Sequence, residues 1–462
     1  SQEEGVVQME IPETVKYIID ELYAHGFEAF AVGGCVRDSI LHRVPGDWDI
    51  TTSARPLDVK RIFRRTIDTG IEHGTVTVMM DSTGYEVTTY RVDGNYVDHR
   101  HPTGVEFTAS LEEDLKRRDF TINAMAYNDR RGLIDLFDGI GDIKRKVIRC
   151  VGDARQRFDE DALRILRAVR FSAQLGFNIE ETTAQAMKEK SPDLQHISAE
   201  RIQTELVKLL VSDHPEYIHK AYELGITSVI LPEYDGIVGV EQHTPNHIYT
   251  VEVHTLKALE NIEPVPALRL TMLMHDFGKP AVKQTRPDGR DIFYRHPEVS
   301  AQMTKKIMKR LKFDNHTMDT VVRLVQWHGL KYEPTEYHLR QALNRVGRDL
   351  FDDFLKVQTA DVLGKSPAVI EKKLVLLKEK RAVYEKVIRE DQCFEIKKLA
   401  VNGKDLIAAG IKPGPLLGAV LERLLDKVIE NQSLNTKEQL LELAVNVKDD
   451  ADIFEERPAF FC

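Results

Sequence analysis

The first part of the chain alternates between helical and strand-like patterns of hydrophobic positions. Apolar residues recur at helical spacing over residues 12–25, and the short apolar run 27–32 is typical of a buried strand. A second strand is expected over residues 47–52. The Thr-, Val- and Met-rich runs 74–81 and 85–91 flank a Ser-Thr-Gly turn, which predicts a hairpin. These elements predict a small domain that contains both helices and a sheet.

The helical period dominates from residue 153 almost to the end. Asp153 is a suitable N-cap for a helical stretch that reaches Leu175, where Gly176 would stop it. Further helices are predicted over residues 199–210, 249–259, 297–311, 349–361, 367–390 and 415–430. The predicted fold class is therefore α+β: a small mixed-sheet head followed by a long all-helical neck, body and tail.

A length of 462 residues is too great for one ordinary domain. Changes of periodicity separate a head, over residues 1–150, from a long helical part. We expect this part to divide into a neck over 151–245, a body over 246–365 and a C-terminal region over 366–462. Hydrophobic residues make up 42% and charged residues 30%, which excludes wholesale disorder. No apolar run approaches the roughly 18 residues of a membrane-spanning helix, so no membrane partner is expected.

The cysteines and the net charge indicate the expected compartment and limit how the chain could bind nucleic acid. Cys35, Cys150, Cys393 and Cys462 are far apart, which excludes a disulfide scaffold and a cysteine zinc finger. Together with an acidic start that lacks a secretory signal, they predict a cytoplasmic protein. The net charge of −10 gives no overall attraction for nucleic acid, so RNA binding would need a local basic patch.

Two acids of the head indicate metal-dependent chemistry. On a strand, residues i and i+2 point to the same face, so Asp47 and Asp49 are expected to project together. Two carboxylates this close repel unless a cation lies between them, and Mg²⁺ is a hard cation that prefers oxygen ligands. Two such ions about 4 Å apart stabilise the attacking and leaving oxygens of phosphoryl transfer. The pair therefore predicts a magnesium site for that class of reaction.

Phosphate-binding features surround these acids. A turn at Gly33 and Gly34 lets backbone N–H groups approach a phosphate, with a helix N-terminus behind them, and Arg37 can reach a triphosphate oxygen. Glu86, on the next hairpin, is a candidate third carboxylate acting as base or metal ligand; the alternative is an exposed strand acid. A lone Asp-x-Asp or Gly-Gly is a weak signal, whereas their combination on strand, turn, helix and strand is far more specific.

The head resembles a known family. The segments GGCVRD, GDWDITTSARP, HGTVTV, EVTTYR and RRDFTINAMAYN are similar to those of the class II tRNA nucleotidyltransferases (CCA-adding enzymes) and the related bacterial poly(A) polymerases. These proteins belong to the polymerase β-like nucleotidyltransferase superfamily. The resemblance is strong over residues 25–175 and weaker beyond. It implies a catalytic head, a neck that selects nucleotides and binds RNA, and a C-terminal region that binds tRNA.

The resemblance also implies roles for individual residues. Asp47 and Asp49 would hold the catalytic magnesium, while Gly34 and Arg37 would contact the incoming nucleoside triphosphate. Further nucleotide contacts are implied for Arg118, Asp119, Asn123, Arg167 and Arg170. Without the resemblance, Arg117 and Arg118 would be interpreted as the solvated end of a helix. The polar segment 92–102 lies where the family has a flexible loop that assists the switch from C to A addition, which disfavours a CC-only enzyme.

A pair of neck residues offers a physical basis for choosing the base. If residues 153–175 form one helix, Asp161 and Arg164 are surface neighbours that present an acceptor beside a donor fork. Cytosine and adenine both offer an amino donor next to a ring-nitrogen acceptor, whereas guanine and uracil offer the reverse. The pair would therefore accept C and A and leave buried groups unpaired against G and U. The alternative is an ordinary surface ion pair.

The helical body carries histidines and aspartates in a characteristic order. His254, His275, Asp276 and Asp361 resemble the metal ligands of the HD phosphohydrolase superfamily, and His296 and His328 lie between them in the sequence. Neutral imidazoles and carboxylates suit a divalent metal ion, which could activate water against a phosphodiester. The resemblance implies an HD-type domain over 246–365 with a second divalent metal; the alternative is a degenerate domain kept as an RNA-binding scaffold.

The preferred hypothesis is a template-independent enzyme that adds or repairs the 3′-terminal CCA of tRNA from CTP and ATP. The 3′-hydroxyl of tRNA would attack the α-phosphate in line, and pyrophosphate would leave. An A-adding enzyme or a poly(A) polymerase would use the same chemistry, although the acidic net charge disfavours the polymerase. Two hypotheses of other classes are an HD phosphohydrolase with an accessory head and an RNA-binding protein without catalysis.

Overall fold

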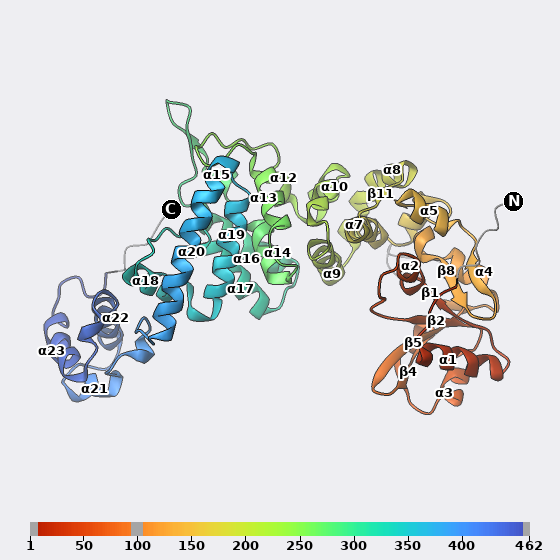
Figure 1. Ribbon diagram of the computed structural model, residues 1–462, viewed down its shortest axis with the longest axis horizontal. Helices are drawn as coiled ribbons and strands as arrows, with labels where there is room; N and C mark the ends of the chain where they lie inside the picture. The colour runs from red at the N-terminus through yellow and green to blue at the C-terminus, as the bar shows by residue number, and fades with distance from the viewer. Residues whose placement is uncertain (1–7, 94–104, 456–462) are drawn as a thin grey trace. The chain divides into compact units, whose positions relative to one another are not determined.

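The computed structural model describes residues 8–93 and 105–455. The chain divides into two compact units, Ser1–Pro232 and Glu233–Cys462. The first contains a mixed sheet and several helices, and the second is built almost wholly of helices (Figure 1). The predicted α+β class is confirmed, whereas the division into four parts stays a prediction.

A seven-stranded sheet in the order β3-β4-β5-β2-β1-β8-β9 forms the centre of the head. Strand β2 runs parallel to β5 and antiparallel to β1, so the sheet is mixed. The strands are β1 (Ala29–Val32), β2 (Asp49–Thr52), β3 (Thr66–Gly70), β4 (Thr75–Met80), β5 (Thr83–Thr89), β8 (Met125–Asn128) and β9 (Gly132–Asp135). The predicted hairpin is the β4–β5 pair, in which Val76 lies opposite Val87.

Two apolar clusters hold helices against this sheet. Helix α1 (Glu13–Ala24) buries residues such as Ile18 and Leu22 in a cluster that includes Val76, Val78 and Val87, and α3 (Pro56–Ile62) adds Val59. A second cluster joins Phe30 of β1 to Leu111 and Leu115 of α4 (Leu111–Lys116). Because both clusters include β1 residues, this strand is buried throughout, as its uninterrupted apolar run predicts.

Helices follow the sheet in the rest of the first unit, and small two-stranded pairs lie among them. Ser110 caps α4 by accepting a hydrogen bond from the Glu113 backbone N–H. The remaining helices and strands of this unit are α2 (Gly34–Ile40), β6 (Arg91–Asp93), β7 (Val105–Phe107), α5 (Gly139–Arg145), β10 (Val147–Ile148), α6 (Ala154–Glu160), α7 (Leu163–Leu175), β11 (Asn178–Ile179), α8 (Glu181–Lys190), α9 (Ala199–Leu210), α10 (Ile218–Glu223) and α11 (Thr227–Ile230). Helix α12 (Pro232–Asp235) begins at the last residue of this unit and lies mainly in the second.

The prediction of one helix from residue 153 to residue 175 is wrong. The chain breaks between α6 and α7, where Asp161 has extended dihedral angles of φ −151° and ψ 104°. Its side chain accepts a hydrogen bond from the Leu163 backbone N–H at 3.1 Å, so a residue taken for a helix-surface acid instead satisfies the start of a new helix. The predicted ends are correct, because Asp153 caps α6 and Gly176 follows α7 with φ +71°.

The second unit matches the predicted helices closely but is not all-helical. A short antiparallel hairpin of β12 (Gln284–Thr285) and β13 (Asp291–Ile292) interrupts it. The helices are α13 (Val251–Glu260), α14 (Pro266–Met274), α15 (Lys279–Val282), α16 (His296–Arg310), α17 (Asn315–Trp327), α18 (Glu336–Val346), α19 (Phe351–Leu363), α20 (Pro367–Arg389), α21 (Gly403–Ala408), α22 (Pro415–Glu430) and α23 (Lys437–Val447). None of the described helices combines the length and apolar character needed to cross a membrane.

Candidate active sites

A strongly charged cleft of about 610 Å³ lies in the first unit. Eight of its lining residues are basic and five are acidic, so the cleft is locally positive in a chain whose net charge is −10. This local excess is the basic patch that binding of a polyanion requires. The lining includes Gly33, Gly34, Arg37, Asp38, Asp47, Asp49, Arg117, Arg118, Asp119, Asn123, Asp161, Arg164, Arg167, Arg170, Phe171, Arg201 and Lys208.

The turn after β1 places the first part of this lining. Gly33 has φ +83° and ψ −135°, a conformation that essentially only glycine adopts, and it lets the chain turn directly from β1 into α2. Arg37 of α2 is buried, and its guanidinium donates to Asp38 Oδ1 at 3.0 Å and to Asn123 Oδ1 at 2.5 Å. Two predicted nucleotide-binding residues, Arg37 and Asn123, are therefore held together by a hydrogen bond.

The three predicted carboxylates differ in position. Asp49 begins β2 opposite Val32, whereas Asp47 precedes the strand, so the predicted same-face argument does not apply to it. Both nevertheless line the cleft, and Glu86 lies on the neighbouring β5. Desolvation, followed by the charges of Glu86 and Asp47, raises the pKa of Asp49 to about 6, although Arg118 opposes this shift. A bound cation would relieve this repulsion.

The carboxylates of the head do not form a complete metal cage by themselves. In the described part of the chain, groups of three or more ligand atoms within 4.8 Å of one another occur only in the second unit. This agrees with the usual behaviour of Mg²⁺, which binds to one or two carboxylates and completes its shell with substrate phosphates and water.

Arg118 is oriented by the buried Asp114 and presents an unsatisfied donor. Its Nη2 lies 3.4 Å from Asp114 Oδ2, which also accepts a hydrogen bond from the Thr51 hydroxyl. Burial alone would raise the pKa of Asp114, but the charges of Arg118 and Arg117 lower it. The Nε of Arg118 is buried and has no hydrogen-bond partner among the described residues. An anionic ligand in the cleft would satisfy this donor.

Asp119 joins the sheet domain to helix α7. Its Oδ2 accepts from Arg167 Nε at 2.8 Å, and its Oδ1 accepts from the Phe120 backbone N–H at 2.7 Å. Burial alone would raise the pKa of Asp119, but Arg167 and then Arg164 lower it to about 2. Asp119 therefore acts as a fixed anion that holds Arg167 of helix α7 in place.

We expect Asp119→Asn to destabilise the first unit by about 2 kcal/mol at neutral pH, because the ionised carboxylate is favoured in the folded state. A lowered pKa contributes stability above the unfolded value of 3.8, and this contribution is lost as the pH falls through about 2. The difference from the parent protein should therefore shrink by about half near pH 3. Urea unfolding monitored by Trp48 fluorescence, in a Trp327→Phe background, measures it; a difference that persists unchanged at pH 3 would contradict the assignment.

Asp161 and Arg164 both line the cleft, although not as neighbours on one helix. Arg164 is anchored at three points: its Nη1 donates to the Arg157 backbone carbonyl and to Glu160, and its Nη2 donates to the Arg117 backbone carbonyl. Asp161 lies 3.5 Å from Arg201 of α9. Burial raises the pKa of Asp161, against the opposing charges of Arg201 and Arg164. The structure therefore fixes both groups rigidly, as a selective base-binding site requires.

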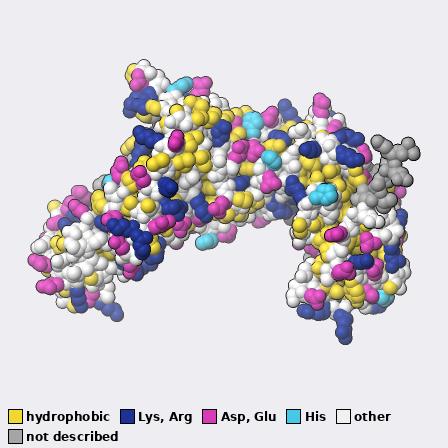
Figure 2. All heavy atoms as spheres, in the orientation of Figure 1, with side chains coloured by type: hydrophobic (Ala, Val, Ile, Leu, Met, Phe, Trp, Pro, Cys, Tyr) yellow, Lys and Arg dark blue, Asp and Glu magenta, His cyan; other side chains and the backbone are white. Residues whose placement is uncertain are grey.

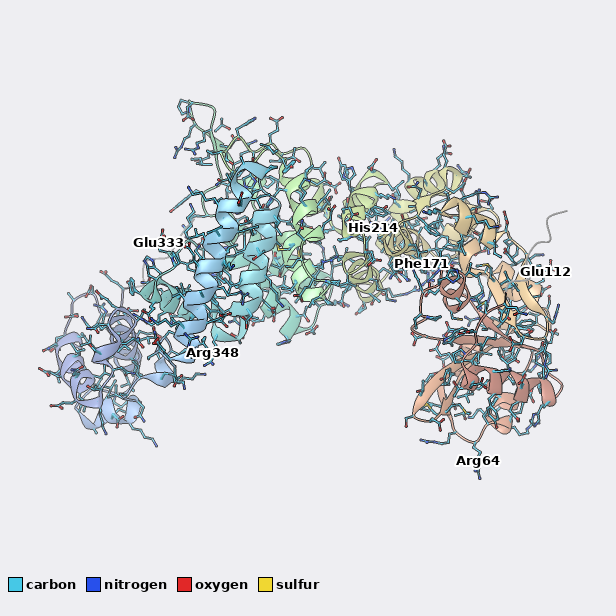
Figure 3. The ribbon with its side chains drawn as sticks, viewed as in Figure 1. Arg64, Glu112, Phe171, His214, Glu333 and Arg348 are labelled. Atoms are coloured by element: carbon cyan, nitrogen blue, oxygen red, sulfur yellow. The ribbon has the colours of Figure 1, made fainter. Side chains whose placement is uncertain are left out.

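An aromatic ring in the lining of the cleft was not predicted from the sequence. The guanidinium carbons of Arg37, Arg167 and Arg170 lie 5.2, 5.3 and 4.1 Å from the centre of the Phe171 ring. Phe171 lies on α7 and is labelled in Figure 3. Arg170 is also held by Glu205, with its Nε 2.7 Å from the carboxylate. Phe171 follows Arg164 by seven residues, so the helical period could have placed it on the same face.

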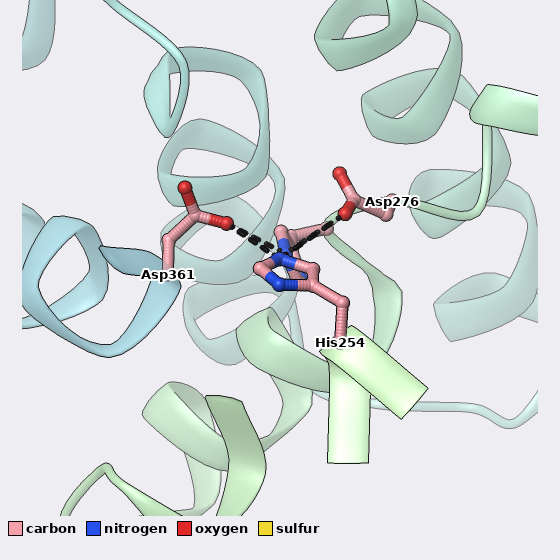
Figure 4. A group of neighbouring side chains, drawn as sticks. His254, Asp276 and Asp361 are labelled. Carbon is pink, nitrogen blue, oxygen red and sulfur yellow. Dashed lines mark hydrogen bonds and ion pairs between the residues drawn. The ribbon is translucent and has the colours of Figure 1, made fainter. Parts of the chain in front are cut away.

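The second unit contains a buried cluster of imidazoles and carboxylates. His254 comes from α13, His275 and Asp276 follow α14, and Asp361 comes from α19. The His254 and His275 Nε2 atoms lie 2.9 and 3.1 Å from Asp361 Oδ1, and 3.5 and 3.2 Å from Asp276 Oδ2 (Figure 4). The four residues predicted to form an HD site are thus brought together from three helices.

Two further histidines face the other oxygen of the same aspartate. His296 and His328 Nε2 lie 3.3 and 3.6 Å from Asp276 Oδ1, and 3.3 Å from each other. Together with Asp276 they form a second group whose ligand atoms lie within 4.8 Å of one another. The sequence contained both histidines in the right order, but spacing alone did not show that they approach the same carboxylate.

The backbone fixes which nitrogen each ring directs into the cluster. The Nδ1 atoms lie within hydrogen-bond distance of backbone carbonyls, those of Gly364 for His254, Met272 for His275, Phe293 for His296 and Val325 for His328. With the proton on Nδ1, the Nε2 lone pairs face one another in two pairs, each 3.3 Å apart. Such pairs repel unless a cation lies between them, so the donor set fits metal ions.

The charges of the cluster support the same conclusion. Burial alone would raise the pKa of Asp276. The positive charge of neighbours such as His275 and Lys279 nevertheless holds this pKa well below its usual range. Conversely, Asp276 and Asp361 raise the pKa of His275 to about 10, against the effect of burial. Asp276 Oδ2 has ion-pair contacts with His254, His275 and Lys279, but no described residue donates a well-aligned hydrogen bond to it. These buried acids require positive charge, which protons or metal ions can supply.

Comparison with known proteins identifies the family. A CCA-adding enzyme from Pediococcus pentosaceus is 35% identical over 441 residues, which cover 95% of this chain and 99% of that enzyme. Another from Lactobacillus delbrueckii subsp. bulgaricus is 37% identical over 92% of this chain and 95% of that enzyme. The chain belongs to the CCA-adding enzyme family. The predicted family and its tRNA nucleotidyltransferase activity are thereby confirmed.

Domain profiles and solved structures agree with the family. The poly A polymerase head domain matches residues 29–149, the RNA and SrmB-binding site of polymerase A matches 176–237, and tRNA nucleotidyltransferase domain 2 matches 293–444. The Bacillus stearothermophilus CCA-adding enzyme in complex with CTP is 31% identical, has a TM-score of 0.72 and covers 95% of this chain and 98% of its own. The Thermotoga maritima CCA-adding enzyme complexed with tRNA shares the fold, with a TM-score of 0.55. It is 21% identical, and the match covers 95% of this chain and 96% of its own.

Membership of the CCA-adding enzyme family implies the use of a divalent metal ion. The identity of that ion and the roles of individual site residues stay predictions. The predicted C-to-A switching loop, residues 92–102, lies outside the described residues from position 94 onward.

Proposed function

We propose that the cleft of the first unit is where this chain joins CMP and AMP, from CTP and ATP, to the 3′ end of tRNA. One observation carries this proposal: an excess of arginines, including a buried Arg118 donor without a partner, surrounds the two acids Asp47 and Asp49. This combination suits a triphosphate and the cation that accompanies it. Because tRNA is the proposed substrate, the cytoplasm is retained as the expected compartment.

The residues of the cleft divide the reaction between them. Asp47 and Asp49 would hold Mg²⁺, which when bound lowers the pKa of the 3′-hydroxyl and neutralises phosphate charge. Glu86 lies beside them as a third carboxylate. Arg37 and Arg118 would orient the triphosphate so that the 3′-hydroxyl oxygen attacks the α-phosphorus in line. The P–O bond to the β-phosphate breaks, and pyrophosphate leaves.

Asp161 and Arg164 would select the base. A carboxylate that accepts from an exocyclic amino group and a guanidinium that donates to a ring nitrogen fit cytosine and adenine equally. Uracil and guanine present a carbonyl and a ring N–H, so each would leave both protein groups unpaired. The three-point anchoring of Arg164 keeps this donor from following the wrong base.

The decisive experiment uses tRNAs that lack the last three, two or one nucleotides, each incubated with a single nucleoside triphosphate. Full CCA addition predicts CMP incorporation on the two shorter substrates and AMP incorporation on the longest. Incorporation of AMP alone would identify an A-adding enzyme, and long A tails would identify a poly(A) polymerase. tRNA binding without any incorporation would contradict the proposal and support a non-catalytic RNA-binding protein.

A second candidate function is metal-dependent phosphohydrolysis in the second unit. It is favoured by the two His pairs that face separate oxygens of Asp276. His254, His275 and Asp361 would hold one divalent ion, and His296 and His328 a second, with Asp276 shared between them. Bound ions would supply a nucleophilic water and neutralise a phosphate. The backbone carbonyls on every Nδ1 keep the rings oriented for this role.

We expect Asp276→Asn to reduce the bound divalent metal from about two ions per chain to none, because the amide cannot supply the shared negative charge. Hydrolysis of bis(p-nitrophenyl) phosphate should be lost, while CTP and ATP incorporation continues. Elemental analysis of protein purified with Mn²⁺, Co²⁺ or Ni²⁺ measures the metal, and Asp319→Asn, an exposed acid on α17, serves as the control. Unchanged metal content in the Asp276 variant would contradict the site.

A further inference from the structure

A cavity of about 530 Å³ opens over the His/Asp cluster of the second unit. Asp276, His296, His328 and Asp361 form part of its lining, so a molecule in the cavity would touch the proposed metal centre directly. The remaining polar lining comes from the segment before α13, from the β12–β13 hairpin and from the turn after α17. These elements decide which phosphate ester can enter.

Basic residues dominate the lining, and they fall into two classes. Lys279 and Lys365 are engaged by the cluster, with Nζ atoms 3.3 Å from Asp276 and 3.4 Å from Asp361. In contrast, Arg286, Arg290 and Lys331 are exposed and form no side-chain ion pair within the described ranges 8–93 and 105–455. Asp291, the third acid of the lining, lies 3.6 Å from Lys283 outside the lining, so three positive charges remain for a ligand.

The hairpin presents two of these charges in a fixed arrangement. The Arg286 backbone N–H donates to the Arg290 carbonyl at 2.7 Å, and the Gly289 N–H donates back to the Arg286 carbonyl at 2.8 Å. Gly289 has φ +89°, which closes the turn without strain. Asp291 ties the hairpin down through the Thr285 hydroxyl and the His243 backbone N–H. Basic side chains gather over this projecting hairpin in Figure 2.

Two buried polar atoms of the same lining lack partners. Thr244 Oγ1 and His247 Nδ1 form no hydrogen bond to any described residue. The His247 ring packs edge-on against His254, with centroids 4.9 Å apart, so it lies beside the cluster. Leaving such groups unsatisfied costs about 1–3 kcal/mol each, which a bound polar ligand would offset. The orphaned atoms are a second, independent sign of a ligand site.

We propose that this cavity takes substrates that carry a second phosphate group beside the one that is cleaved, with Arg286, Arg290 and Lys331 binding the second group. The inference rests on the proposed phosphohydrolase function. A single phosphate at the cluster would be neutralised there, which leaves three basic side chains unmatched. A second phosphate, with a charge of about −2, matches them and can bond bidentately to arginine.

The reaction itself is hydrolysis. The oxygen of water bonds to the scissile phosphorus, the bond from phosphorus to the ester oxygen breaks, and that oxygen takes a proton from the attacking water. The second phosphate stays intact on the hairpin side. Both a small nucleoside bisphosphate and the phosphorylated end of an oligonucleotide carry this chemistry, so the test includes one of each.

The test compares three substrates of the Mn²⁺-loaded full chain: p-nitrophenyl phosphate, adenosine 3′,5′-bisphosphate and a dinucleotide phosphorylated at both ends. The variants are Arg286→Ala with Arg290→Ala, and Lys331→Ala. We expect the double variant to raise KM for substrates with two phosphates by about 10–100-fold, with kcat within about twofold. Its kinetics with p-nitrophenyl phosphate should not change. Whichever two-phosphate substrate shows the larger KM effect identifies the source of the ligand.

Two controls make the outcome decisive. Arg389→Ala removes an exposed arginine of α20 outside the cavity and should change nothing. Replacing Arg286 and Arg290 by lysine should restore part of the affinity, which separates charge from folding. Calorimetry of adenosine 3′,5′-bisphosphate with chelator-treated protein should show binding about tenfold weaker in the double alanine variant than in Arg389→Ala.

The possible failures are distinguishable. Equal KM values for the parent protein and the double variant on both two-phosphate substrates would overturn the inference while leaving the phosphohydrolase standing. Absence of hydrolysis of all three substrates by the metal-loaded parent protein, with bis(p-nitrophenyl) phosphate still cleaved, would overturn the inference alone. Absence of hydrolysis of that diester as well would refute the phosphohydrolase function, and the inference with it.

Discussion

Replacing Asp49 by alanine is expected to reduce incorporation of both CTP and ATP by about a thousandfold or more, while tRNA binding survives. Asp49 begins β2 in the cleft, and burial, followed by the charges of Glu86 and Asp47, already raises its pKa to about 6. Its removal relieves that repulsion, so the fold should not suffer. What is lost is the ligand that holds a cation against the reacting phosphate.

Single-turnover incorporation with both nucleotides, together with filter binding of tRNA, measures the effect. Asp20→Ala is a matched control, because Asp20 is an exposed acid of α1 that pairs with the exposed Arg130 at 3.7 Å. Lost tRNA binding with residual turnover would refute the assignment of Asp49 as a metal ligand.

Replacing Arg164 by alanine is expected to lower the discrimination of C and A against U and G by about a hundredfold. Its guanidinium is held by two backbone carbonyls and Glu160, so the parent enzyme cannot adapt this donor to a base with the reverse pattern. Alanine removes the hydrogen bond that Arg164 would donate to C or A. It also removes the donor that would be left unpaired against U or G. Overall incorporation of CTP should fall as misincorporation of UTP rises.

Competition between CTP and UTP, and between ATP and GTP, measures this selectivity as ratios of kcat/KM. Arg164→Lys should behave like alanine, because an ammonium group lacks the planar fork. Arg155→Ala provides the control, since Arg155 of α6 is exposed and pairs with Glu189 away from the cleft. Selectivity that stays unchanged in Arg164→Ala would remove the argument for a protein template.

Patterns of apolar spacing and end residues predicted the helices and strands of this fold well. They predicted the contacts between these elements less well. Helices α9 and α22 have the predicted limits, because their apolar spacing and end residues agree. The break at Asp161 was missed, because the sequence continues in helical period on both sides and only the side-chain bond to Leu163 marks the change. The sequence analysis paired Asp161 with Arg164 because both were expected on one helix. The structure places both residues in the cleft, but Asp161 lies between two helices.

The candidate sites show the same limit. Motifs placed Asp47, Asp49 and Arg37 correctly in one cleft, whereas Phe171 and Arg201 entered it only through the packing of α7 and α9. His296 and His328 were visible in the sequence, but their approach to Asp276 depends on how α16 and α17 meet α14. Contacts between distant segments are set by tertiary packing, which a periodicity of side chains does not encode.

If the two His pairs hold metal ions, the carboxylate that they share would make metal loading of the second unit a coupled equilibrium. An ion held by His254 and His275 would draw electron density from Asp276, the same group that His296 and His328 would need. Occupancy at one position would therefore alter affinity at the other, and the two dissociation constants would belong to the pair rather than to either ion. The amount of metal bound per chain, plotted against free metal concentration, should not fit two independent hyperbolas. The departure measures how strongly the two positions are coupled through Asp276.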